Sequence, residues 1–134
     1  MSFLGVTYAH QQDENFKEFL DQLPIPPEKT EAFLTFKPTA LLEKDGDTYI
    51  STTSTPAGDK VTKFESGVEF EEKVTEDLVS KSTYTVEDNV VTLVQKYPDG
   101  RSITYKREYK DYELVVTLTF SDWDGIAKRY YVAI

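Results

Sequence analysis

The sequence predicts an all-β protein, an antiparallel β-barrel preceded by two short helices, on three observations. Helical periodicity is confined to residues 13–34, near the start of the chain. From about Thr39 onward, turn signals recur at roughly even intervals. The segments between these turns are short and rich in Val, Ile, Thr, Tyr and Phe, which favour strands.

Length and composition narrow the class of protein. A chain of 134 residues fits one domain, so we expect a single domain over residues 1–134. The formal net charge of −9 repels polyphosphate, which argues against a nucleic-acid partner. Because the chain has no cysteine, no disulfide framework and no thiolate nucleophile or metal ligand can be proposed.

The start of the chain favours a cytoplasmic protein. Residues 1–5 lack the basic start and the apolar run of a signal peptide. No later segment approaches the length of apolar sequence that spans a membrane. A cytoplasmic location is therefore expected.

The helical region is expected to form a hairpin of two helices. Asp13 is the expected N-cap of the first helix, and Pro24 ends it. The second helix begins near Pro26, with Phe33 and Leu34 on its buried side. Apolar residues three and four positions apart define the buried face of the first helix, at Phe16, Phe19, Leu20 and Leu23.

Eight turn signals divide the rest of the chain. The clearest strands between them are residues 81–86, 90–97, 103–109 and 114–120. So many consecutive strands leave exposed edges unless the sheet closes, and a barrel is the economical closure. The turn signals fall at Asp45-Gly46, Gly58-Asp59, Ser66-Gly67, Glu76-Asp77, Asp88-Asn89, Pro98-Asp99-Gly100, Lys110-Asp111 and Asp124-Gly125.

Alternation assigns the inward faces of two strands. In residues 103–109, Arg107 shares a face with Ile103, Tyr105 and Tyr109. Because an interior charge is costly unless it is paired, an inward Arg107 requires an anion or a hydrogen-bonded network. In residues 114–120 the apolar, inward set is Leu114, Val116, Leu118 and Phe120.

The last strand carries a second arginine whose direction is ambiguous. One face would hold Arg129 and Tyr131, and the other Lys128 and Tyr130. Since each face contains one cation, periodicity alone does not decide which points inward. If Arg129 faces inward beside Tyr131, two guanidiniums and a phenol from nearby strands form a site for a carboxylate.

Short segments whose order and spacing are together specific recur along nearly the whole chain. They are Phe3-Leu4-Gly5, Glu14-Asn15-Phe16, Lys37-Pro38-Thr39, Asp45-Gly46-Asp47, Gly67-Val68-Glu69-Phe70-Glu71-Glu72, Lys81-Ser82-Thr83, Val94-Gln95-Lys96-Tyr97, Lys106-Arg107-Glu108, Leu114-Val115-Val116 and Arg129-Tyr130-Tyr131. In these segments the chain resembles the intracellular lipid-binding protein family, the fatty-acid-binding proteins and their retinoid-binding relatives. Its two ends look most like the insect fatty-acid-binding proteins.

The resemblance implies a ten-stranded antiparallel up-and-down barrel, closed over by a two-helix lid at about residues 14–36. It also implies a non-enzymatic carrier that holds a long-chain fatty acid inside the barrel. The family's first interior arginine matches Arg107, and its Arg-x-Tyr motif matches Arg129 and Tyr131. These three residues are the expected carboxylate site, which places Arg129 and Tyr131 inward.

Two arginines argue against a neutral ligand such as retinol, which would leave them unsatisfied. Another hydrophobic carboxylate, such as a retinoid acid, remains an alternative. Gln95 is expected to be a polar interior group that holds ordered water. With it, the candidate cavity wall consists of Phe16, Phe19, Leu20, Pro38, Gln95, Tyr105, Val116 and Leu118.

The sequence departs from the family's common vertebrate pattern near the start and at the portal. Between Gly5 and Phe16 it has one residue more than that pattern. Pro56 stands where a portal phenylalanine is often found. These departures leave the choice of ligand within the family open.

We expect a monomer without cofactor or metal. The acidic run at residues 69–77 is interpreted as a solvated turn region, because it lacks a calcium-loop spacing. An enzyme is the competing class, and it would rest on His10, the only histidine, with Asp13 nearby. A weak contact of the lid with anionic membranes is a further hypothesis, based on the lysines expected near the portal, Lys17, Lys29, Lys60 and Lys63.

Overall fold

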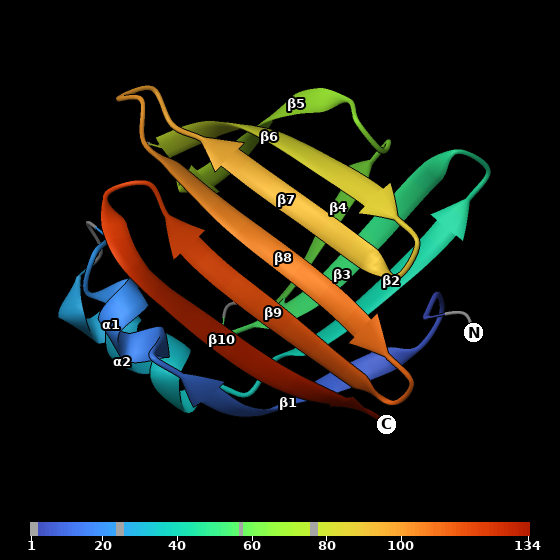
Figure 1. The fold of residues 1–134 in the computed structure, drawn as a ribbon, viewed down its shortest axis with the longest axis horizontal. Helices are drawn as coiled ribbons and strands as arrows, with labels where there is room; N and C mark the ends of the chain where they lie inside the picture. The colour runs from blue at the N-terminus through green and yellow to red at the C-terminus, as the bar shows by residue number, and fades with distance from the viewer. Residues whose placement is uncertain (1–2, 24–25, 57, 76–77) are drawn as a thin grey trace.

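Ten antiparallel strands curl into a nearly closed barrel in the computed structural model, which describes residues 3–23, 26–56, 58–75 and 78–134 (Figure 1). The predicted fold class, including the two short helices, is confirmed. In chain order the elements are β1 (Thr7–Glu14), α1 (Phe16–Leu20), α2 (Pro27–Thr35), β2 (Thr39–Asp45), β3 (Thr48–Thr55), β4 (Gly58–Phe64), β5 (Glu69–Thr75), β6 (Leu78–Glu87), β7 (Val90–Lys96), β8 (Ser102–Lys110), β9 (Glu113–Phe120) and β10 (Trp123–Ala133).

The strands form an up-and-down sheet in which the last strand closes against the first. The order is β4-β3-β2-β1-β10-β9-β8-β7-β6-β5, so β1 pairs with both β2 and β10. β4 and β5 stand at the two ends of this order, and each has one hydrogen-bonded neighbour. Their seam is therefore held by side chains rather than by a backbone ladder.

The first helix is shorter than predicted. It begins at Phe16 and covers five residues, so Leu23 lies beyond its end. The prediction that Asp13 caps it was wrong, because Asp13 is the seventh residue of β1 and the N-cap residue is Asn15. Asn15 lies in the left-handed region at φ 58 and makes no side-chain capping bond. The predicted stop at Pro24 lies outside the described residues.

The second helix lies across one end of the barrel beside α1 (Figure 1). It begins at Pro27, and proline in the first turn needs no amide hydrogen bond. Phe33 was predicted to be buried but is 39% exposed, and none of the described residues of α2 is buried. The reason is that Phe33 borders the cavity that α2 covers. Leu34, by contrast, is partly buried and packs against the hydrophobic core.

Aromatic rings stack within the barrel. Phe64 and Tyr84 stack with their ring centroids 3.9 Å apart, and Phe3 stacks on Tyr109 at 4.2 Å. Such buried rings contribute much of the apolar area removed from water. The inward set predicted for β9 is confirmed, since the following residues are all buried: Leu114, Val116, Leu118 and Phe120.

One predicted turn is wrong. Asp124-Gly125 lies inside β10, and the chain turns instead at residues 121–122. The register with β9 shifts between Trp123 and Ala127, which marks an irregularity in the strand. There the indole of Trp123 occupies the space that a β-carbon on residue 125 would need, so any other residue at this position requires the indole to shift. The predicted turn at Glu76-Asp77 lies outside the described residues.

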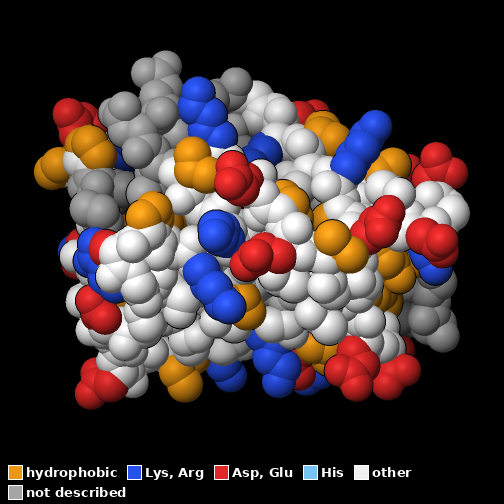
Figure 2. Space-filling view, turned by 90° about the horizontal axis from the view of Figure 1, so that it is seen from above, with side chains coloured by type: hydrophobic (Ala, Val, Ile, Leu, Met, Phe, Trp, Pro, Cys, Tyr) orange, Lys and Arg blue, Asp and Glu red, His pale blue; other side chains and the backbone are white. Residues whose placement is uncertain are grey.

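Charged side chains of both signs share the exterior. Figure 2 shows them interspersed with isolated hydrophobic side chains over the upper face of the barrel. Within the residues that the structure describes, no helix is long and apolar enough to cross a membrane. The same residues contain no group of three or more His, Cys, Asp or Glu side chains placed to hold a metal ion.

Candidate functional site

The barrel contains a cavity of about 1150 Å³ with a mostly apolar wall. Most of its described lining comes from the two helices and from the inner faces of β8, β9 and β10, and Ala40 of β2 and Thr53 of β3 complete the opposite side. Residues of α2, such as Lys29 and Phe33, and the turn after β7 also border it, so the cavity extends to the lid. Six of the eight residues predicted for its wall line it: Phe16, Phe19, Leu20, Tyr105, Val116 and Leu118.

The other two predicted wall residues lie elsewhere. Pro38 is buried beside a smaller space of about 120 Å³, which Arg129 and Tyr131 also line. Gln95 is buried on the same inner face as its strand partner Ile103 but does not line the cavity. Its amide nitrogen donates to Glu72 at 3.0 Å and its carbonyl accepts from the Tyr97 hydroxyl at 3.0 Å. The Gln95 side chain therefore belongs to a hydrogen-bonded network between strands.

Arg107 and Arg129 lie in one row across three neighbouring strands. Arg107 of β8 pairs with Val116 of β9, which pairs in turn with Arg129 of β10. Directly paired residues share a face of the sheet, and two strand spacings put the two Cα atoms about 10 Å apart. Both arginines line the main cavity.

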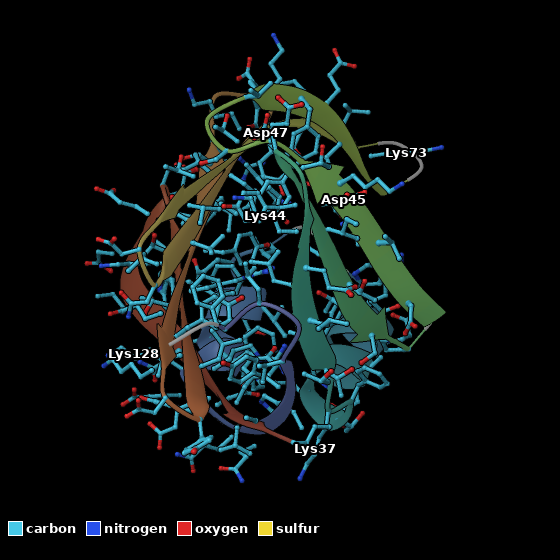
Figure 3. The ribbon with its side chains drawn as sticks, turned by 90° about the vertical axis from the view of Figure 1, so that its right-hand side faces the viewer. Lys37, Lys44, Asp45, Asp47, Lys73 and Lys128 are labelled. Carbon is cyan, nitrogen blue, oxygen red and sulfur yellow. The ribbon has the colours of Figure 1, made fainter. Side chains whose placement is uncertain are left out.

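The ambiguity of the last strand is resolved in favour of Arg129. Its side chain is 11% exposed and lies against the ring of Phe16, with 4.0 Å between the guanidinium carbon and the ring centroid. Its Nε donates to the Asp13 carboxylate at 2.8 Å, whereas Nη2 is buried without a hydrogen-bond partner among the described residues. Lys128 lies on the outer side of the wall (Figure 3).

Arg107, unlike Arg129, is surrounded by neutral polar and aromatic side chains and has no carboxylate partner among the described residues. Its Nη1 donates to the Ser51 hydroxyl at 3.4 Å, and its guanidinium lies 5.9 Å from the ring centroid of Tyr84. Burial disfavours the charged form, but the surrounding tyrosines outweigh burial, so the pKa of Arg107 is raised. The guanidinium therefore keeps its charge inside the barrel.

Tyr131 lies one inward position beyond Arg129. It pairs with His10 of β1 and with Leu114 of β9, and its ring meets that of His10 edge-on at 5.4 Å. Burial raises the pKa of Tyr131, although Arg129 and Arg107 act in the opposite direction. The phenol therefore keeps its proton and can donate it to an acceptor in the cavity.

Asp13 and His10 join this site, although sequence analysis assigned neither to it. Asp13 pairs in register with Arg129, and His10 Nε2 lies 2.6 Å from the same carboxylate oxygen that accepts from Arg129. Both side chains face inward because the register of β1 shifts between His10 and Gln12. The signal for this bulge was the extra residue between Gly5 and Phe16.

A second buried carboxylate corrects the interpretation of the acidic run. Glu72 was expected in a solvated turn, but it is 7% exposed and accepts from Ser82 at 2.9 Å and Gln95 at 3.0 Å. Lys60 of β4 reaches it across the seam at 3.0 Å. Burial opposes ionisation, but Lys60 and the two hydrogen bonds outweigh burial and lower the pKa of Glu72.

Comparisons of the sequence and of the structure with known proteins both find fatty-acid-binding proteins. Fatty acid-binding protein 1 of Manduca sexta is 44% identical over 133 residues, which cover 99% of this chain and all of that protein. The crystal structure of a fatty-acid-binding protein from Manduca sexta superposes with a TM-score of 0.90 at 43% identity, covering 98% of this chain and all of the other.

A less similar insect protein has the same fold. The fatty acid-binding protein from brain tissue of Drosophila melanogaster superposes with a TM-score of 0.90 at 32% identity, over 98% of this chain and all of that one. No protein-family model matches the sequence. With near-complete coverage, 44% identity and the same ten-stranded barrel, this chain belongs to the fatty-acid-binding protein family.

Proposed function

We propose that this protein is a non-enzymatic carrier that holds a long-chain fatty acid inside the barrel. The carboxylate would be bound by the guanidiniums of Arg107 and Arg129 and by the hydroxyl of Tyr131. The acyl chain would lie along the apolar wall beneath the lid, where Phe16 and Phe19 line the cavity. The cavity is large for a site that encloses one small molecule, so it also has room for water.

The observation that carries this proposal is the unsatisfied donor on Arg129. Its Nη2 is buried next to an apolar cavity and lacks a partner among the described residues. A buried donor without a partner is unfavourable, and a carboxylate entering the cavity would satisfy it. Each charge-assisted hydrogen bond then contributes about 1.5–3 kcal/mol. Each acyl methylene removed from water adds about 0.8 kcal/mol, which makes chain length the stronger determinant of affinity.

The cavity offers little for catalysis. Its described lining contains no histidine, serine or cysteine. His10, the basis of the enzyme alternative, is buried against Asp13 and Tyr131 instead of bordering the main cavity. A carrier role fits a lining in which a few polar groups can bind the head group of a ligand and the remaining groups are apolar.

We further propose that the protein is a cytoplasmic monomer of one domain. A single sheet contains every described strand, and both helices border its cavity, so they act as a lid through which ligand passes. Contact of this lid with anionic membranes remains a hypothesis. It predicts that ligand transfer to anionic vesicles slows when salt is added, whereas transfer to neutral vesicles does not.

Two measurements test the carrier role. Native mass spectrometry of protein purified from cells, followed by extraction, should reveal a bound long-chain carboxylate. Titration of delipidated protein should then show tighter binding of hexadecanoate than of hexadecanol, with retinoic acid as a bulkier competing carboxylate. Protein that is consistently empty and rejects fatty acids in titration would contradict the proposal.

A further inference from the structure

The structure places a carboxylate of the protein beside the proposed carboxylate site. Asp13, Arg129, Val116 and Arg107 occupy one row across β1, β10, β9 and β8. Asp13 is directly paired with Arg129, and its oxygen accepts from Nε at 2.8 Å. Asp13 thus binds the guanidinium through Nε, while Nη2 has no protein partner among the described residues.

The position of Asp13 depends on the bulge in β1. In a regular strand, residues three apart point to opposite faces of the sheet. The single extra residue between His10 and Gln12 resets this alternation, so His10 and Asp13 both lie on the inner side. Their contact of 2.6 Å fixes the carboxylate against Arg129.

Asp13 changes the charge that a ligand meets. Arg107 and Arg129 together carry two positive charges, and the Asp13 carboxylate removes one. His10 adds a positive charge only when its imidazole is protonated. Glu72, the buried acid among the described residues, is already paired with Lys60. The site therefore offers one net positive charge to an incoming head group.

We infer that Asp13 makes the anchor selective for ligands with a single negative charge, such as carboxylates, and disfavours dianionic head groups such as phosphate monoesters. This inference rests on the proposed function. A monoanion neutralises the remaining positive charge. A dianion leaves one uncompensated negative charge in a buried site, next to a fixed carboxylate that repels it.

A simpler role for Asp13 predicts a different result. If Asp13 only positions the Arg129 guanidinium, its loss weakens every anionic ligand by a similar factor. If it sets the charge of the site, its loss improves dianions relative to monoanions. The ratio of two affinities therefore separates the two roles, whereas a single affinity does not.

The test uses three ligands with the same hexadecyl chain: hexadecanoate, hexadecanesulfonate and hexadecyl phosphate. Sulfonate and phosphate are both tetrahedral, but only the phosphate is a dianion at about pH 8, where imidazoles are also generally neutral. Each ligand is titrated into delipidated protein, for wild type and for Asp13→Asn. Glu14→Gln is the matched control, because Glu14 is the next residue of β1, is exposed, and accepts from the Tyr130 hydroxyl at 3.2 Å on the outer face.

The wild-type protein should bind hexadecanesulfonate at least about tenfold more tightly than hexadecyl phosphate. In Asp13→Asn this ratio should move toward the phosphate by about tenfold or more, and in Glu14→Gln it should not change. The wild-type comparison stands without any variant, so it tests the inference even if Asp13→Asn fails to fold.

Two outcomes would overturn the inference. One is a wild-type protein that binds the phosphate as tightly as the sulfonate. The other is a folded Asp13→Asn variant with an unchanged affinity ratio. If hexadecanoate still binds in either case, the proposed carrier function survives and only the charge selectivity fails. If no ligand binds, both fail.

Discussion

The seam between β4 and β5 gives the sharpest prediction for stability. The two strands share no backbone ladder, and Lys60 of β4 reaches the buried carboxylate of Glu72 on β5 at 3.0 Å. Replacing Lys60 with methionine keeps most of the apolar stem but removes the cation. Glu72 then stays buried with two neutral donors, Ser82 and Gln95.

The size of the effect follows from the exposure of the two partners. Removing one partner of a fully buried ion pair costs about 3–5 kcal/mol, and an exposed pair contributes about 0.2–1 kcal/mol. Here the Glu72 side chain is 7% exposed and that of Lys60 is 47% exposed, so solvent screens one side only. We expect Lys60→Met to lower the free energy of unfolding by about 1–3 kcal/mol near neutral pH.

The sign of the pH dependence provides a second test. In the wild type the folded-state pKa of Glu72 is lowered, so its stabilisation is present above the unfolded pKa and is lost as pH falls through the folded value. Without Lys60, burial dominates and raises that pKa, so acid relieves the buried charge. The difference between wild type and variant should therefore shrink from about pH 7 to about pH 4.5.

Urea unfolding at both pH values measures this difference. Lys63→Met is the control, because Lys63 lies on the same strand, is exposed and carries the same charge. Adding Glu72→Gln to Lys60→Met should restore part of the stability by removing the unpaired charge. The reasoning is refuted if Lys60→Met and Lys63→Met unfold alike, or if the loss is the same at both pH values.

Three further substitutions test the site and the strand that carries it. Arg129→Gln should weaken hexadecanoate about 10- to 100-fold but hexadecanol by less than about threefold, and equal losses in titration would mean that the arginine is structural. Tyr131→Phe should cost about 2- to 10-fold in hexadecanoate affinity, because it removes one neutral donor, and an unchanged affinity would exclude that donor. Gly125→Ala should lower the free energy of unfolding by about 1–3 kcal/mol, because the new methyl group overlaps the Trp123 indole; equal urea midpoints would show that the indole moves away freely.

Much of the fold was accessible from the sequence because its signals are local. The alternation of β9 identified the inward side chains, since one face of that strand is apolar throughout. The same rule placed Arg107 with the apolar set of β8. It was insufficient for β10, where each face carries a cation, and only the family spacing separated Arg129 from Lys128.

The parts that could not be predicted depend on long-range geometry. A bulge is one extra residue in a pairing register; the sequence showed an extra residue between Gly5 and Phe16, but not where in the strand pairing it falls. Asp13 therefore looked like a helix cap, a role common for aspartate before an apolar periodic segment. Glu72 looked solvated because its neighbours in sequence are acidic, while the cation that pairs with it comes from another strand.

The bulge also links the proposed head-group site to the first helix. Asp13 holds Arg129, and Arg129 in turn lies on Phe16, the first residue of α1. A helix of five residues is too short to be stable alone, so α1 is ordered by what it packs against. Phe19 packs on Trp123 from the same strand as Arg129. A ligand that occupies the cavity would touch both the arginine and this helix, so the proposed binding of a carboxylate would also bring the ligand against the lid.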